Sequence, residues 1–441
     1  AIPSIVAYLV TSLYNIVDQI FIGQGVGYLG NAATNVAFPF TTVSTAIALM
    51  MGIGTAANFN LNLGAGNEER ARRVAGTGLS CLALFSLTLG LIALFFRGPL
   101  LNLFGATPEV LPYAMIYTGI TAFGLPMVTF TTGASSLVRA DGSPTYSMLC
   151  TLSGAVLNTI LDPVFIFGLD MGVAGGALAT VLGQALSLVM VLRTRIRTIR
   201  LTAASLHPSG PLLRAICSLG VSPFLNQMAM FLVQITLNNT LTYYGALSHY
   251  GEDIPLACVG VISKVNILML GFTLGISQGC QPIFSYNYGA RQYSRVREAY
   301  RKAIVAASII CCIAFVCFQL FPRPIVALFD PSGSEEYFQF AERYFRIYMF
   351  MTLANAFQPI TANFFTSIGK AKRGALIALT RQVIFLIPLI LIFPLFLGID
   401  GVMYAGPIAD SAAVVVALAL VTREMKRMPH VDEPVAADTL V

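Results

Sequence analysis

The sequence predicts an all-α integral membrane protein with twelve transmembrane helices in two parallel, pseudo-symmetric six-helix bundles. The prediction rests on the composition, on the length of the apolar runs and on an internal repeat. Of the 441 residues, 56% are hydrophobic and 10% are charged, whereas a soluble domain is about 25% charged. The mean hydropathy is +0.77. These values exclude a cytosolic enzyme, a secreted disulfide scaffold and a disordered chain.

The apolar runs predict the individual membrane spans, because a bilayer-crossing helix needs about 20 mostly apolar residues. We expect a first bundle within 1–192, a basic cytoplasmic linker over 193–214, a second bundle over 215–421 and a cytoplasmic tail over 422–441. The chain begins at Ala1 inside an apolar segment, so we expect that the native start is missing. The twelve expected spans are 1–23, 34–60, 74–96, 111–138, 145–168, 172–192, 215–245, 255–287, 299–321, 340–367, 374–397 and 401–421.

Two short patterns occur once in each half of the chain. Asn62 with Gly64-Ala65 recurs 225 residues later as Asn287 with Gly289-Ala290. Gly168-Leu169-Asp170 recurs 230 residues later as Gly398-Ile399-Asp400. Six spans per repeat is an even number, so both repeats enter the membrane from the same side. Parallel repeats about an axis along the membrane normal are a transporter architecture.

The distribution of positive charge predicts the orientation in the membrane. If the N-terminus is cytoplasmic, 20 of the 26 Lys and Arg residues lie in or beside the cytoplasmic segments. The opposite loops contain only Arg97 and Arg323, and Arg343 and Arg346 lie near the start of the tenth span. This asymmetry predicts a multi-pass protein of the bacterial inner membrane with both termini in the cytoplasm.

Ionisable residues inside the spans are the candidate functional residues, because a charge in hydrocarbon is costly. Asp18 and Asp162 each lie five or six residues before the outer end of their span, which is roughly 8–9 Å deep. Asn158 lies one turn from Asp162 on the same helix face, and Thr180 of the next span lies at a similar depth. These oxygen-bearing groups suit Na⁺ or a proton shared by two carboxylates. The alternative is that each group satisfies a local backbone defect, for example around Pro163.

Three other features are candidates for a conformational or structural role. Lys264 and Asp410 lie near the midplane of their spans, so we predict an ion pair, either structural or used in transport. Arg381 is expected to extend its side chain to the inner membrane surface. Pro3 is expected to permit a bend in the helix that carries Asp18, or to be a plain kink.

Soluble catalytic motifs are missing from the sequence. It contains no GxxxxGK[ST], GxSxG or HExxH pattern and only three His residues. We therefore expect neither an enzyme nor a bound cofactor, and energy from an ion gradient or an associated ATPase.

Several segments resemble the multidrug and toxic compound extrusion (MATE) transporters, particularly their MepA-like branch. They are Leu13 to Gly23, the Asn158-x-x-x-Asp162-Pro163 pattern and Gly279-Cys280-Gln281-Pro282-Ile283 with Tyr286-Asn287-Tyr288-Gly289-Ala290. The resemblance extends over all twelve spans. It implies an exporter of amphiphilic organic cations driven by inward Na⁺ or H⁺, with a cation site in the first bundle. The residues that match that site are Asp18, Asn158, Asp162 and Thr180, with Tyr14 one turn before Asp18 and Pro3 as the bending proline. The family's other coupling pattern, with an acid in the seventh span, is missing here.

The sequence therefore predicts a cation-coupled multidrug antiporter that works as a monomer by alternating access and has no nucleic acid partner. One alternative is a flippase for lipid-linked saccharides of the same superfamily. Such proteins usually need a strongly cationic cavity, and the predicted spans contain few cations. The other alternative is a non-transporting membrane receptor or channel. The sequence does not distinguish Na⁺ from H⁺ coupling.

Overall fold

The computed structural model describes residues 1–104, 106, 108–193, 203–250, 253–328, 335–429 and 432. These residues form helices joined by short turns, and no strand occurs among them. The first half contains α1 (Ile2–Val26), α2 (Tyr28–Gly64), α3 (Glu68–Leu103), α4 (Leu111–Ala140), α5 (Pro144–Pro163), the π-helical turn η1 (Val164–Gly168) and α6 (Gly172–Leu192). The short η2 (Ala203–Leu206) lies in the linker. The second half contains α7 (Gly210–Ala246), α8 (Asp253–Gly289), α9 (Tyr293–Leu320), α10 (Pro322–Ala327), α11 (Glu335–Tyr348), η3 (Met349–Ala356), α12 (Gln358–Ser367), α13 (Ala371–Leu379), η4 (Thr380–Leu386), α14 (Ile387–Leu397) and α15 (Ile399–Arg427).

Eleven helical segments of the described chain are long and apolar enough to cross a membrane. They agree with eleven of the twelve expected spans. The expected tenth span, 340–367, is instead divided into α11, the 3-10 segment η3 and α12, and Met351 has non-helical backbone angles. Pro359 in the first turn of α12 explains part of the break, because it has no N–H to donate to the carbonyl four residues earlier.

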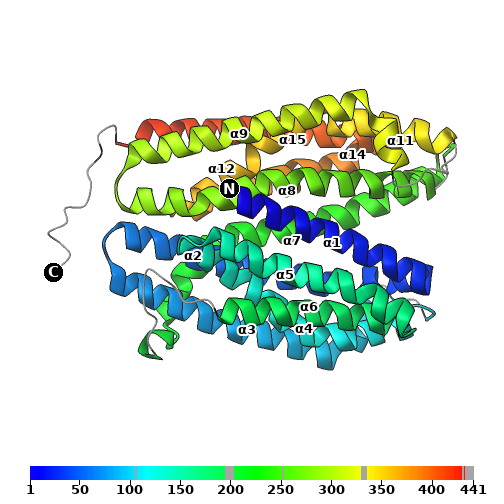
Figure 1. The fold of residues 1–441 in the computed structure, drawn as a ribbon. Coiled ribbons are helices and arrows are strands. Elements are labelled where there is room, and N and C mark those ends of the chain that lie inside the picture. The colour runs from blue at the N-terminus through cyan, green and yellow to red at the C-terminus, as the bar shows by residue number, and fades with distance from the viewer. Residues whose placement is uncertain are drawn as a thin grey trace.

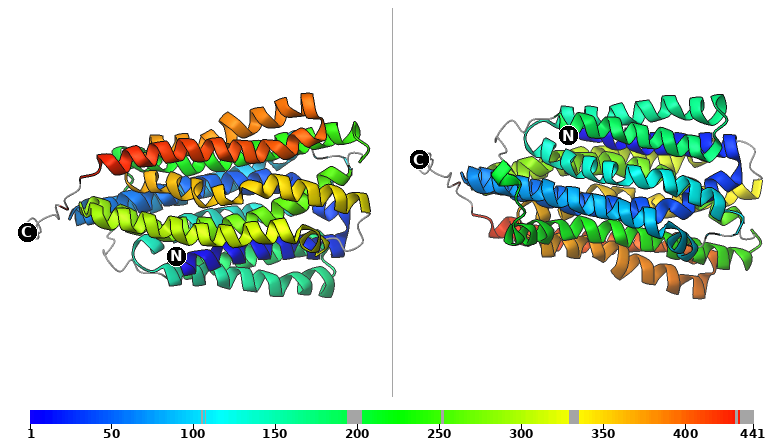
Figure 2. Two further views of the ribbon diagram at one scale, coloured as in Figure 1. Left: turned by 90° about the horizontal axis from the view of Figure 1, so that it is seen from above. Right: turned by 90° about the horizontal axis from the view of Figure 1, so that it is seen from below.

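The helices form an elongated bundle with one half of the chain on each side (Figure 1). Helices α3 to α6 lie along one side, α9, α11, α14 and α15 lie along the other, and α1, α2, α7 and α8 lie between them. Views from above and below show the same long axis for both halves (Figure 2). The expected two-bundle architecture is confirmed.

Turns with left-handed backbone angles recur at matching places in the two halves. Gly66 after α2 corresponds to Arg291 after α8, with φ values of 77° and 56°. Gly142 after α4 corresponds to Gly369 after α12, with φ values of 80° and 82°. Gly172, the first residue of α6, and Gly398, directly before α15, lie in matching connections, with φ values of 55° and 60°. Left-handed backbone geometry favours glycine, and five of these six residues are glycines. The shared geometry marks the same turns in each repeat.

Glycines bring the two halves together along the second half of α2, up to the α2–α3 turn. We call the end of the bundle that carries the α2–α3 and α8–α9 turns the closed end. A Cβ atom on Gly220 of α7 would lie 1.9 Å from the Met50 carbonyl oxygen of α2. A Cβ atom on Gly64 would lie 2.1 Å from the Tyr286 carbonyl oxygen of α8. Only a residue without a side chain permits backbones to approach so closely.

The contact between α1 and α8 loosens with distance from the closed end. Cβ atoms on Gly279 and Gly275 would lie 2.6 Å from Cα of Ala1 and 2.4 Å from Cα of Ile5. One turn further, a Cβ atom on Gly271 would lie 3.4 Å from the nearest atom of Leu9, and at Gly260 nothing lies within 4 Å. The two helices therefore diverge toward the opposite end, which we call the open end.

Candidate cation site in the N-terminal half

Helices α1 and α5 bring the two predicted aspartates together. The packing of α1 on α5 places the carboxyl groups of Asp18 and Asp162 within hydrogen-bonding reach of each other. Asp18 is 9% exposed and Asp162 is fully buried. Two carboxyl groups this close repel each other when both are charged, and a shared proton or a bound cation would remove that repulsion.

The amide of Asn158 connects the aspartates to α6. Its Nδ2 donates to Asp162 Oδ1 over 3.4 Å and to Thr180 Oγ1 over 3.3 Å. These long hydrogen bonds hold three of the predicted residues in one cluster. The spacing of four residues on α5 and the depth argument for Thr180 therefore agree with the geometry.

Unpartnered oxygen atoms make the cluster suitable for a cation. Asp18 Oδ1, Asp162 Oδ2 and Asn158 Oδ1 are all buried and have no hydrogen-bond partner. Three acceptors without a donor are the environment that a hard cation with oxygen ligands requires, and a proton on one carboxyl would satisfy part of it. Within the described residues, no group of three or more His, Cys, Asp or Glu side chains could hold a metal ion.

Two tyrosines lie beside the aspartates. Tyr14 of α1 and Tyr117 of α4 both lie within electrostatic range of Asp18 and Asp162. Tyr14 was expected from its position one turn before Asp18, whereas Tyr117 was missed. Tyr117 is six residues into α4, roughly 9 Å from its start, which is the depth of the aspartates. The same depth argument would have found it.

Close packing covers the site at the open end of the bundle. The side chain of Ile22, one turn beyond Asp18, is fully buried against Gly176 of α6. Gly175 in turn allows the backbone of η1 to approach α6, since its Cβ atom would lie 2.8 Å from Phe165. Pro163 has no N–H and directly precedes the π-helical turn η1, so the helix changes its winding just after Asp162.

Asp410 of the second half pairs with Arg381, so the predicted pair with Lys264 is wrong. Arg381 Nε lies 2.5 Å from Asp410 Oδ1, and the two side chains are 12% and 6% exposed. Lys264 is half-buried in α8 and has no ion pair in the described chain. Arg381 lies in the π-helical turn η4 and points into the bundle, not to the membrane surface. Depth along a helix does not reveal which way a side chain points.

Pro3 lies in the first turn of α1, at the closed end, far from Asp18. The N–H groups in the first turn of a helix have no acceptor within the helix, so a proline there costs no hydrogen bond. Pro3 is therefore compatible with the helical geometry at this position. Helix α1 is continuous from Ile2 to Val26. Any effect of Pro3 on transport stays a prediction.

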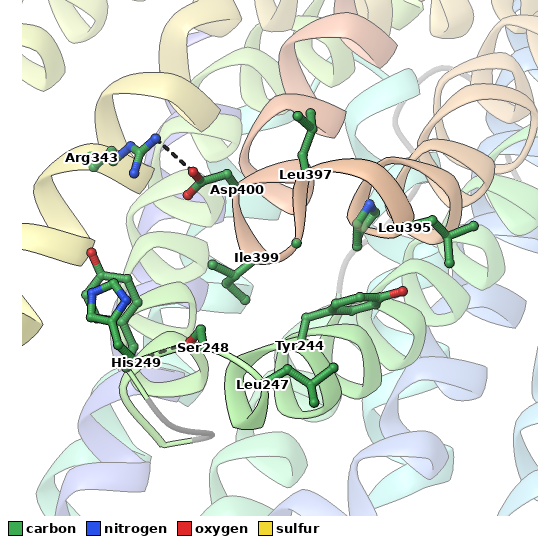
Figure 3. Close-up of a pocket in the computed structure, with 12 residues that line it drawn as sticks. Tyr244, Leu247, Ser248, His249, Arg343, Leu395, Leu397, Ile399 and Asp400 are labelled. Atoms are coloured by element: carbon green, nitrogen blue, oxygen red, sulfur yellow. Dashed lines mark hydrogen bonds and ion pairs between the residues drawn. The ribbon is translucent and has the colours of Figure 1, made fainter.

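A cavity of about 460 Å³ lies at the open end of the second half (Figure 3). Arg343 and Asp400 form an ion pair of 2.8 Å on one wall, and Tyr244 and His249 lie on the other side. All its lining residues belong to α7, α11, α14, α15 and the turns that follow α7 and α14. This cavity is therefore separate from the aspartates of α1 and α5.

Comparison with known proteins agrees with the fold and the repeat. The MatE family model matches residues 3–164 and again residues 227–392. The multidrug export protein MepA of Staphylococcus haemolyticus (strain JCSC1435) is 24% identical over 430 residues, covering 96% of this chain and 91% of the relative. MepA of Staphylococcus aureus (strain MRSA252) is 23% identical over 426 residues, covering 96% and 92%.

Two solved structures have the same fold over nearly the whole chain. The MATE multidrug transporter DinF-BH, solved as a complex, has a TM-score of 0.88 and 33% identity, covering 96% of this chain and 94% of its own. The outward-facing conformation of a MATE family transporter of the MOP superfamily has a TM-score of 0.90 and 24% identity, covering 98% and 95%. The chain belongs to the MatE family of multidrug transporters. It is a multi-pass membrane protein whose relatives include multidrug export proteins.

Proposed function

We propose that this protein is a multidrug antiporter that exports amphiphilic organic cations in exchange for Na⁺ or H⁺. The observation that carries the proposal is the buried pair Asp18 and Asp162 with three unpartnered acceptor oxygens. A cation or proton bound there neutralises the carboxyls and changes the packing of α1, which contacts both halves. Coupling requires only that this change alters the affinity for the drug.

Buried polar atoms without a partner support coupling in the first half. Among the described residues, the second half has such atoms only in Asn266, Gln292 and Tyr344. The others lie in the first half, in Ser4, Asp18, Thr55, Asn60, Arg72, Thr77, Thr118, Thr131, Ser135, Arg139, Asn158, Asp162 and Gln184. Of these atoms, those of Asp18, Asn158 and Asp162 belong to the candidate cation cluster. The second half has its own charge-compensated pair, Arg381 and Asp410.

The location and assembly belong to the same proposal. We infer the bacterial inner membrane, with both termini and the closed end in the cytoplasm, from the basic residues near that end. In this orientation the end at which α1 and α8 diverge would face the outside. We also propose that the protein works as a monomer and has no cofactor, nucleic acid partner or enzymatic activity. The coupling ion is its only inorganic partner.

Efflux from proteoliposomes with independently imposed Na⁺ and pH gradients tests the function. Wild-type protein should export a fluorescent organic cation under one gradient, and Asp18→Asn or Asp162→Asn should abolish it. Normal gradient-driven efflux by the well-expressed variants would refute the site. Ion current without exchange would indicate a channel, and transport of a lipid-linked saccharide in place of the dye would indicate a flippase.

A further inference from the structure

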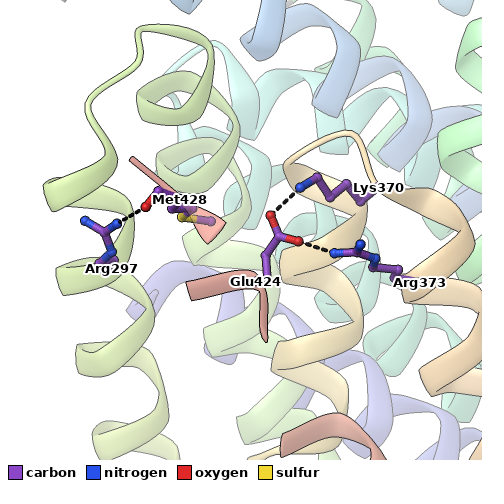
Figure 4. Close-up of polar contacts among 5 residues, drawn as sticks. All are labelled: Arg297, Lys370, Arg373, Glu424 and Met428. Carbon is purple, nitrogen blue, oxygen red and sulfur yellow. Dashed lines mark hydrogen bonds and ion pairs between the residues drawn. The ribbon is translucent and has the colours of Figure 1, made fainter. Parts of the chain in front are cut away.

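The last turn of α15 contains a buried carboxylate that binds two cations from another part of the chain (Figure 4). Glu424 is 1% exposed, and it accepts hydrogen bonds from Lys370 and Arg373. Lys370 lies in the turn between α12 and α13, where Gly369 has the left-handed backbone, and Arg373 lies in the first turn of α13. Charge-assisted bonds to a buried carboxylate are among the stronger polar contacts of a protein.

The residues after α15 bind the start of α9 in the same way. The helix ends at Arg427, and Met428 is extended, as expected for a residue before proline. Arg297 of α9 donates to the carbonyl oxygens of Met428 and Pro429, each over 2.8 Å. The carboxylate of Asp432 accepts a hydrogen bond from the hydroxyl of Ser294 and another, over 2.9 Å, from the backbone N–H of Ser294. These bonds hold the pKa of Asp432 below its ordinary value, so it stays charged at neutral pH. We call Glu424, Met428, Pro429 and Asp432 the brace.

The two turns that the brace holds form one side of the contact between the halves. Ala371, directly after Lys370, is buried with Ala57 of α2 and packs near Leu61. Gly289, at the α8–α9 turn, approaches the same helix, since its Cβ atom would lie 2.2 Å from the Leu61 carbonyl oxygen. The end of α2 therefore contacts both turns, and we call this contact the seal.

We propose that the brace positions the α8–α9 and α12–α13 turns against α2 and so stabilises the state in which the seal is closed. The argument rests on the proposed alternation between two open states. Backbone contacts with glycine tolerate shifts of only a few tenths of an ångström, so loss of either anchor weakens the seal. Glu424 is thus a positioning residue and contacts neither the drug nor the coupling ion.

Distances between spin labels at the closed end test this role. One label replaces the exposed Glu69 of α3 and the other replaces the exposed Arg301 of α9, in a background without the native cysteines. We expect Glu424→Gln to increase the ratio of long to short distances about tenfold, within the usual range of conformational coupling. Arg297→Gln removes the hydrogen bonds with Met428 and Pro429 and the charge interaction with Asp432, and leaves the contacts of Glu424 in place. It should shift the ratio in the same direction by less.

Glu298→Gln is the matched control. It makes the same chemical change as Glu424→Gln, but at an exposed position of α9 directly after Arg297, in an ion pair of 2.6 Å with Lys302. The neighbouring Val296 is fully buried, so a substitution on the exposed face leaves the core of α9 unchanged. The distance distribution of Glu298→Gln should therefore equal that of the unsubstituted background.

Three results would overturn the proposal. The first is an unchanged distance ratio in Glu424→Gln or Arg297→Gln protein that elutes as a single species with wild-type helicity. The second is an equal shift in Glu298→Gln. The third is a shift toward shorter distances. If Glu424→Gln does not fold, the Arg297→Gln measurement decides alone. The distances do not depend on transport, so failed efflux by the wild type would refute the proposed function while leaving this result intact.

Discussion

At the scale of single residues, the site depends on groups that lack partners within the protein. The oxygens Asp18 Oδ1, Asp162 Oδ2 and Asn158 Oδ1 are buried without donors, and Asn158 also holds Asp162 and Thr180 together. A buried acceptor without a donor is costly, and a bound cation or proton removes that cost. We therefore expect the cluster to gain stability when a cation or a proton binds.

Asn158→Ala should weaken ion binding without abolishing folding. It removes one unpartnered oxygen and two long hydrogen bonds, so we expect about a tenfold loss of affinity for the coupling ion, as for a bond to a charged group. The measurement is radioactive Na⁺ binding, or proton release on drug addition, with purified protein. Asn102→Ala, which removes a local bond on the exposed side of α3, is the control and should bind normally.

The pair Arg381 and Asp410 should behave as a buried ion pair. Arg381→Met and Asp410→Leu should each destabilise the protein by about 3–5 kcal/mol, and the double variant should recover most of that loss. Thermal unfolding in detergent measures the three values. Lys264→Met should cost much less, because Lys264 has no ion pair in the described chain. Losses that simply add would show that the two side chains do not interact.

The sequence predicted the residues of the cation site better than the ion pair of the second half. Asp18, Asn158 and Asp162 follow from depth and from spacing on one helix, which are local properties. The partner of Asp410 depends on how α15 and η4 are rotated about their axes, and a π-helical turn changes that rotation by adding a residue to the turn. Depth alone therefore did not distinguish Lys264 from Arg381.

At the scale of the helices, glycines decide where the halves touch. The Gly271, Gly275 and Gly279 positions lie one turn apart on α8 and face α1. This spacing permits two helices to approach within the membrane. The broken tenth span could also be anticipated from Pro359, although hydropathy alone predicts a continuous helix over 340–367.

Gly275→Val should separate α1 from α8. Its Cβ atom would lie 2.4 Å from Cα of Ile5, so one backbone must move, at a cost of about 1–3 kcal/mol for an overpacked contact. Gly260→Val is the control on the same helix, since nothing lies within 4 Å of its Cβ position. The melting temperatures of both variants test the difference. Equal melting temperatures would contradict the close approach of α1 and α8.

At the scale of the whole molecule, the basic residues and the repeat determine the expected orientation. Basic residues gather near the closed end, where the matching turns Gly66 and Arg291 also lie. A membrane-impermeant thiol reagent tests the sidedness in whole cells of a cysteine-free background. A cysteine replacing Glu109, in the turn before α4, should react from outside, whereas a cysteine replacing Glu69 should react only after the cells are opened. The reverse pattern would invert the orientation.

The parallel repeat has a consequence for biogenesis. Each repeat begins and ends at the same face of the membrane, so each carries a complete set of signals for its own insertion. A chain that is divided within the linker, into two separately translated polypeptides, should therefore insert correctly. The glycine contacts between α2 and α7 and between α1 and α8 would then have to assemble the halves after insertion, as in the association of independently inserted helices. Co-purification of the two fragments from one membrane would show that covalent continuity is dispensable for assembly.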